Sequence, residues 1–133
     1  MTDSPIEAPV ARGLALVIDD DEVTRMFLFR SLTTLGFTVK SAADGMAALE
    51  MCLDNSFELV ICDMRMPKLS GISFLKNVRM RSPNSAKRIV FLTSIDDSLI
   101  RRETLEAGAL DYLVKPISTA KLKVVVDKIF GEH

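Results

Sequence analysis

Four short apolar segments of this sequence are each followed by side chains that could do chemistry: in chain order Asp19 with Asp20, Asp63, Thr93 and Lys115. If these groups lie together, three carboxylates about 5 Å apart would repel one another by about 3 kcal/mol per pair at an effective dielectric of about 20. One lysine cannot neutralise three acids, but a divalent cation can. Oxygen ligands without histidine or thiolate favour Mg²⁺, which also binds phosphate oxygens. The residue types therefore indicate a magnesium site.

Five apolar segments alternate with five amphipathic ones, and this alternation must position those side chains. Runs of apolar residues too short for a helix predict strands over 14–18, 37–42, 58–63, 88–92 and 110–114. Helical spacing of apolar residues predicts helices over 22–35, 45–53, 70–82, 98–107 and 119–130. The pattern predicts an α/β fold with a doubly wound, five-stranded parallel sheet, helices on both faces and right-handed crossovers. Strands of such a sheet all finish at the edge where ligands bind, so the reactive groups should meet there.

The helix faces follow from the same spacing. The helical spacing of the first helix places Val23, Phe27, Leu28, Ser31 or Leu32, and Leu35 on one face, and the apolar face of the second consists of Met46, Leu49, Cys52 and Leu53. The fourth helix should expose a charged outer face of Arg101, Arg102, Glu103 and Glu106. Asp21 and Ser70 are the expected caps of the first and third helices.

Composition limits the possible functions. The chain has 133 residues, 48% of them apolar, which fits one globular domain. We expect residues 1–13 to be a flexible tail and residues 14–133 to form the domain. A net charge of −1 without a basic tract argues against binding nucleic acid, and short apolar runs argue against a membrane span, so we expect a cytoplasmic protein. Cys52 and Cys62 should be buried and reduced, and the only histidine, His133, is given no role.

The sequence resembles the response-regulator receiver domains and is similar to the stand-alone, single-domain response regulators of chemotaxis. The resemblance covers the chain after the tail. It is carried by four motifs in order: Leu-Val-Ile-Asp19-Asp20, Ile-Cys-Asp63-Met-Arg-Met-Pro67 with Gly71, Phe-Leu-Thr93-Ser94, and Tyr112-Leu-Val-Lys115-Pro116. Ser94, where relatives often have alanine or glycine, and the bulky Arg65 depart from the family pattern.

The resemblance implies a flavodoxin-like strand order of 2-1-3-4-5 and a phosphorylation-activated switch of a two-component system. Asp63 would accept the phosphoryl group, while Lys115 and Thr93 bind its oxygens. Magnesium would be held by Asp19, Asp20, Asp63 and the carbonyl of Arg65. Thr93 and Tyr112 would relay the change to a downstream protein partner, and we expect a cis Lys115–Pro116 bond. The donor would be a sensor histidine kinase or phosphotransfer protein. No conventional turnover is expected, only self-catalysed phosphorylation and dephosphorylation.

A phosphatase of the haloacid-dehalogenase type is the alternative. Asp19-Asp20-Asp21-Glu22-Val23 after a strand fits its Asp-x-Asp-x-Val pattern, with Asp19 as nucleophile. That family also needs an acidic pair after a strand downstream of its lysine, and here the final helix carries a single acid, Asp127. A flavin-binding module fits less well, because no phosphate-cradling Gly/Ser/Thr loop follows the first strand.

Overall fold

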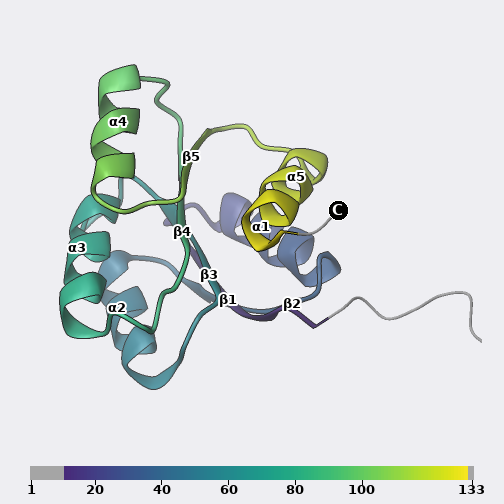
Figure 1. Ribbon diagram of the computed structural model, residues 1–133, viewed down its shortest axis with the longest axis horizontal. Coiled ribbons are helices and arrows are strands. Elements are labelled where there is room, and N and C mark those ends of the chain that lie inside the picture. Colours follow the sequence, from purple (N-terminus) through teal and green to yellow (C-terminus); the bar gives the residue numbers. More distant parts are fainter. Residues whose placement is uncertain (1–10, 132–133) are drawn as a thin grey trace, which may run out of the picture.

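The computed structural model describes residues 11–131, which form five strands and five helices in strict alternation (Figure 1). The strands are β1 (Gly13–Ile18), β2 (Phe37–Ala42), β3 (Leu59–Asp63), β4 (Ile89–Thr93) and β5 (Asp111–Val114). The helices are α1 (Glu22–Thr34), α2 (Gly45–Asp54), α3 (Gly71–Arg81), α4 (Ser98–Glu106) and α5 (Thr119–Phe130). The predicted element order and fold class are confirmed, with boundaries within a few residues.

The five strands form one parallel sheet in the order β2-β1-β3-β4-β5, as predicted. Its register aligns the strand ends: Ile18 pairs with Cys62, Asp63 with Leu92, and Thr93 with Val114. Residues that immediately follow these pairs must therefore lie at one edge of the sheet. This alignment is what brings the reactive side chains together.

Helices cover both faces of the sheet, with α1 and α5 on one side and α2, α3 and α4 on the other (Figure 1). The central strand β3 is buried on both faces, and its residues alternate between the two cores. Val60 and Cys62 contribute to the core under α2 and α3, while Leu59 and Ile61 contribute to the core under α1 and α5. Burial on both faces is why this segment is apolar without interruption.

Each helix begins at a polar side chain that accepts a hydrogen bond from a backbone N–H of the first turn: Asp21, Asp44, Ser70, Asp97 and Ser118. Such caps satisfy N–H groups that have no partner within the helix. The predicted caps Asp21 and Ser70 are confirmed. Asp21 and Asp97 also lie near strand ends, but their carboxylates accept hydrogen bonds from the first turns of α1 and α4.

Two helix faces differ from the prediction. On α1, Val23 is 77% exposed and Phe27 36%, while the core contacts come from Leu28, Ser31 and Leu32. On α2, Met46 and Leu53 are likewise exposed, at 50% and 67%, and the core is reached by residues such as Ala48, Leu49 and Cys52. Helical spacing was correct in both cases, and the predicted Leu28, Leu32, Leu49 and Cys52 do face the core. The buried stripe is nevertheless narrower than predicted, because the other apolar residues named above are exposed.

The first strand begins at Gly13, so this residue belongs to the domain and not to the predicted tail. Just before it, the Arg12 N–H donates to the Gly36 carbonyl oxygen at 3.0 Å. The rest of the predicted tail, residues 1–10, and His133 lie outside the described residues. Within residues 11–131, no helix is long and apolar enough to cross a membrane.

Both cysteines are buried and free, as predicted. Cys62 precedes Asp63 in β3, and its pKa is raised by burial first and then by the negative charges of Asp63 and Asp19. Burial also raises the pKa of Cys52. Both thiols are therefore protonated at neutral pH, which agrees with a purely structural role.

Candidate functional site

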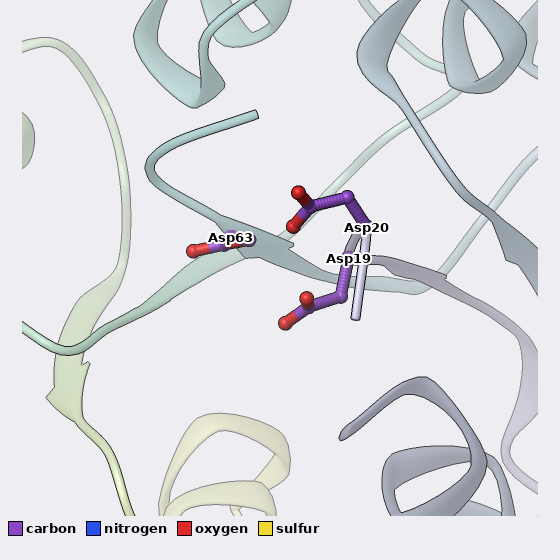
Figure 2. Close-up of side chains that lie close together, drawn as sticks. All are labelled: Asp19, Asp20 and Asp63. Carbon is purple, nitrogen blue, oxygen red and sulfur yellow. The ribbon is translucent and has the colours of Figure 1, made fainter. Parts of the chain in front are cut away.

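Asp19, Asp20 and Asp63 lie together at the carboxyl ends of β1 and β3 (Figure 2). One carboxylate oxygen from each of them lies within 4.8 Å of those from the other two. Asp19 and Asp63 are buried, whereas Asp20 is exposed. The result is an acidic cluster that is open to solvent on the side of Asp20.

Asp19 is held in place by several hydrogen bonds. Its Oδ1 accepts from the Asp21 N–H at 2.9 Å, and its Oδ2 lies 3.1 Å from Nζ of Lys115. Nη1 of Arg25 donates to the backbone carbonyl oxygen of Asp19 at 2.7 Å. Arg25 was not singled out in the sequence, because a bond from a side chain to a distant backbone carbonyl leaves no motif. The turn after β1 is therefore fixed from both its side chain and its main chain.

Lys115 comes from the end of β5 and reaches across the sheet edge to the acidic cluster. Its Nζ lies 3.1 Å from Asp19 Oδ2 and 3.8 Å from Asp63 Oδ1. Its backbone N–H donates to the Thr93 carbonyl oxygen at 2.7 Å, and its bond to Pro116 is cis, as predicted. One ammonium group thus faces two buried carboxylates and does not neutralise both.

The electrostatics of Asp63 reflect this imbalance. Burial, followed by the negative charge of Asp19, raises the pKa of Asp63 to about 6, although Lys115 opposes the rise. Asp63 is 8% exposed, and its carboxylate has one weak backbone donor, the Arg65 N–H at 3.5 Å from Oδ1. Asp63 is therefore mostly ionised at pH 7 but is poorly stabilised as an anion by the residues around it.

This raised pKa predicts a specific pH dependence of stability when Mg²⁺ is removed with a chelator. Asp63 takes up its proton near pH 6 in the folded state but near 3.8 when unfolded, so the fold loses stability progressively as the pH rises from about 4 to about 6, and the loss is complete above that. We expect Asp63→Asn to raise the free energy of unfolding at pH 7 by about 1 to 3 kcal/mol. The advantage should shrink as the pH falls from 7 to 4.

Chemical denaturation across this pH range measures the effect. Asp54→Asn, at the exposed end of α2, is the matched control and should leave the pH profile unchanged. If the Asp63→Asn and unmutated proteins lose stability in parallel from pH 4 to pH 7, Asp63 does not carry the destabilising charge.

The first turn of α3 packs closely against the end of β3 at Gly71. A Cβ atom at Gly71 would lie 2.7 Å from the Asp63 carbonyl oxygen and 2.6 Å from Cε1 of Phe91. Only glycine allows the first turn of α3 to approach the end of β3 this closely. This explains the glycine eight residues after Asp63 in the sequence motif.

Thr93 and Tyr112, the two residues predicted to relay a signal, are both buried, each 1% exposed. Oγ1 of Thr93 accepts from the Ile95 N–H at 3.2 Å, and the Tyr112 hydroxyl donates to the Ile95 carbonyl oxygen at 2.5 Å. The structure therefore connects both residues to the segment after β4, and Tyr112 has its ring in the inward position.

Arg65 is the predicted site residue that contributes no side-chain contact to the cluster. Its side chain is exposed, while its backbone lies beside Asp63 through the weak N–H contact to Oδ1. The prediction concerned its carbonyl oxygen, and that prediction stays open.

The donor set fits magnesium. Three carboxylates supply only oxygen ligands, one of them is exposed to solvent, and the negative charge is incompletely balanced by Lys115. Mg²⁺ prefers oxygen ligands and keeps several of its waters, so an open cluster of this kind suits it better than zinc, which favours nitrogen and sulfur.

Comparison with known proteins shows which family the chain belongs to. The family model for the response regulator receiver domain matches residues 15–127. The chain belongs to this family. It is thus a phosphorylation-activated switch of the two-component type, and the phosphatase alternative is not supported. Receiver domains bind Mg²⁺ at their acidic site, and they interact with kinases and downstream proteins.

Individual relatives agree with this assignment. The chain is 36% identical to a probable chemotaxis protein CheY of Rhizobium etli over 92% of this chain and 96% of the relative. The structure of Vibrio cholerae CheY4 is similar with a TM-score of 0.83 and 31% identity, covering 90% of this chain and 99% of that one. A Borrelia burgdorferi CheY in complex with CheX, BeF₃ and Mg²⁺ also has a TM-score of 0.83, at 28% identity and 90% coverage of both chains. The chain spans less than half the length of several other relatives, which are transcriptional regulators.

Proposed function

We propose that Asp63 is the residue that accepts the phosphoryl group. The observation that carries this proposal is the position of its carboxylate at the end of the central strand, beside two further acids and within 3.8 Å of the Lys115 ammonium. Asp19 competes for the role in principle, but both its oxygens are engaged, by the Asp21 N–H and by Lys115. Asp63 has fewer and weaker partners and is the better nucleophile.

The chemistry requires no general base. At pH 7 the Asp63 carboxylate is mostly ionised, so one oxygen can attack phosphorus directly while the bond from phosphorus to the donor nitrogen breaks and its electrons leave with the donor. Lys115 offsets negative charge on the transferring oxygens, and the Thr93 hydroxyl donates a hydrogen bond to one of them. The product is a mixed anhydride that water hydrolyses, which gives the switch a limited lifetime without conventional turnover.

We assign the magnesium ligands to Asp19, Asp20, Asp63 and the carbonyl oxygen of Arg65. When bound, the cation supplies charge neutralisation of the three acids and of the phosphoryl oxygens. The Arg25 bond to the Asp19 carbonyl and the Asp21 bond to its carboxylate hold the first of these ligands in place.

Magnesium binding distinguishes the ligands from the counter-charge. We expect Asp20→Ala to lower the Mg²⁺ affinity at least about tenfold, because a ligand oxygen is lost, whereas Lys115→Ala should retain it because only a competing positive charge is removed. Isothermal titration calorimetry with MgCl₂ measures both affinities. Comparable losses in the two variants would contradict the assigned roles.

The donor is a phosphohistidine on a sensor histidine kinase or a phosphotransfer protein, in the cytoplasm. Thr93 and Tyr112 carry the signal from the site to a downstream protein. Incubating the purified protein with Mg²⁺ and a small acyl phosphate, and measuring phosphoryl incorporation, tests the proposed function without knowledge of the kinase. Incorporation that persists in EDTA, or that does not occur at all, would contradict it.

A further inference from the structure

Arg101 of α4 makes two contacts of different kinds with one residue of β5. Its guanidinium carbon lies 4.9 Å from the centroid of the Tyr112 ring, and its Nη1 donates to the Tyr112 carbonyl oxygen at 3.1 Å. A planar guanidinium can make both contacts because its face attracts the π system while its edge carries the donors. The prediction that Arg101 belongs to a solvated outer face is therefore wrong, whereas its neighbour Arg102 is exposed.

The ring that Arg101 contacts is connected to the proposed site by hydrogen bonds. The Tyr112 hydroxyl donates to the Ile95 carbonyl oxygen, and the Ile95 N–H donates to Oγ1 of Thr93. Contacts therefore run without a break from Thr93 at the sheet edge, through Ile95 and Tyr112, to Arg101 at the surface of α4. Arg101 is the last residue of this series, counted from the acidic cluster.

We propose that Arg101 is a positioning residue that holds the Tyr112 ring in its buried position. Tyr112 is 1% exposed and its hydroxyl donates to the Ile95 carbonyl oxygen, whereas an outward rotamer would exchange that partner for water and expose the ring. The contacts that the ring makes when buried, including the one with Arg101, therefore decide between the two states. The guanidinium favours the inward state before any phosphoryl transfer. It thereby sets the basal activity of the switch, an inference that rests on the proposed role of Tyr112 in relaying the signal.

The sequence offers an unusually clean probe, because the chain has one tyrosine and no tryptophan. Protein labelled with 3-fluorotyrosine gives a ¹⁹F NMR signal from Tyr112 alone, and its H₂O/D₂O isotope shift reports how exposed the ring is. Arg101→Met keeps the length of the side chain but removes the charge and the donors. Arg101→Lys restores the charge without the planar fork, and Arg102→Met is the matched control on the neighbouring position.

We expect Arg101→Met to raise the ratio of outward to inward Tyr112 about fivefold, as a cation–π contact of ordinary strength implies. Arg101→Lys should fall between this variant and the unmutated protein, and Arg102→Met should match the unmutated protein. A Tyr112 signal that is the same in Arg101→Met as in the unmutated protein would overturn the proposal, as would an equal change in Arg102→Met.

Adding Mg²⁺ and fluoroberyllate, the ligands present in the Borrelia burgdorferi CheY complex, separates this inference from the proposed function. If Mg²⁺ and fluoroberyllate return the Tyr112 ring to its buried position in Arg101→Met, the positioning role of Arg101 and the relay role of Tyr112 are both supported. If they leave Tyr112 unmoved in every variant while Arg101→Met still exposes the ring, the positioning role of Arg101 stands and the relay role of Tyr112 is wrong.

Discussion

Asp63→Asn should abolish phosphoryl incorporation from an acyl phosphate, because the amide has no anionic oxygen with which to attack phosphorus. The loss should be complete within detection, since no neighbouring group can take over: both oxygens of Asp19 are engaged, and Asp20 is exposed at the margin of the cluster. Intact-protein mass spectrometry after incubation with donor and Mg²⁺ measures the phosphorylated fraction directly.

The same variant should remain folded, and without Mg²⁺ it should be more stable than the unmutated protein at pH 7. This separates loss of chemistry from loss of structure. Asp54→Asn, on the exposed end of α2, should incorporate phosphate normally. Phosphorylation of Asp63→Asn at the unmutated rate would mean that another side chain is the acceptor.

Lys115→Ala should slow phosphorylation by about 10²- to 10³-fold, the usual effect of removing one charged group that stabilises a transition state. The variant should also shift the pH dependence of the reaction upward. Lys115 lowers the pKa of Asp63, so its loss raises that pKa, and a higher pH is then needed to ionise the nucleophile.

Stopped-time phosphorylation assays between pH 5 and 9 measure both effects. Lys115→Arg retains a positive charge and should recover part of the rate, while Lys123→Ala on α5, which pairs with Asp127 away from the site, should have no effect. A Lys115→Ala protein with an unchanged pH profile would show that the ammonium does not act on Asp63.

Sequence patterns predicted the residues at the sheet edge well, because each strand and its end can be recognised from a short segment of sequence. Each strand is a short apolar run, each ends at a polar residue, and a parallel sheet places those ends together. For this reason the cluster of Asp19, Asp20 and Asp63 with Lys115 could be predicted without coordinates. The strand order itself came from the family resemblance, since periodicity does not specify which strands are neighbours.

The face of α1 was predicted only in part. This helix carries apolar residues on most of its circumference, so more than one stripe satisfies the helical period. The stripe containing Leu28 and Leu32 packs on the sheet, and Val23 and Phe27 are left exposed. Spacing shows that a helix is amphipathic, but the volume available beneath it determines which stripe is buried.

Contacts between side chains and distant backbone atoms were also beyond prediction. Arg25 and Arg101 both donate to backbone carbonyl oxygens, of Asp19 and Tyr112 respectively. Any residue can supply such an acceptor, so the sequence gives no sign of it. Both arginines read as ordinary charged positions of surface helices, although each contacts a residue on which the proposed mechanism depends.

Mapping the phosphorylated residue tests the central claim most directly. The protein is phosphorylated with an acyl phosphate and Mg²⁺, the anhydride is reduced with borohydride to convert the modified aspartate to homoserine, and the peptides are sequenced by mass spectrometry. We predict homoserine at position 63 and none in protein treated with EDTA. Homoserine at position 19 would contradict the assignment of Asp63 and would point instead to the first strand as the source of the nucleophile.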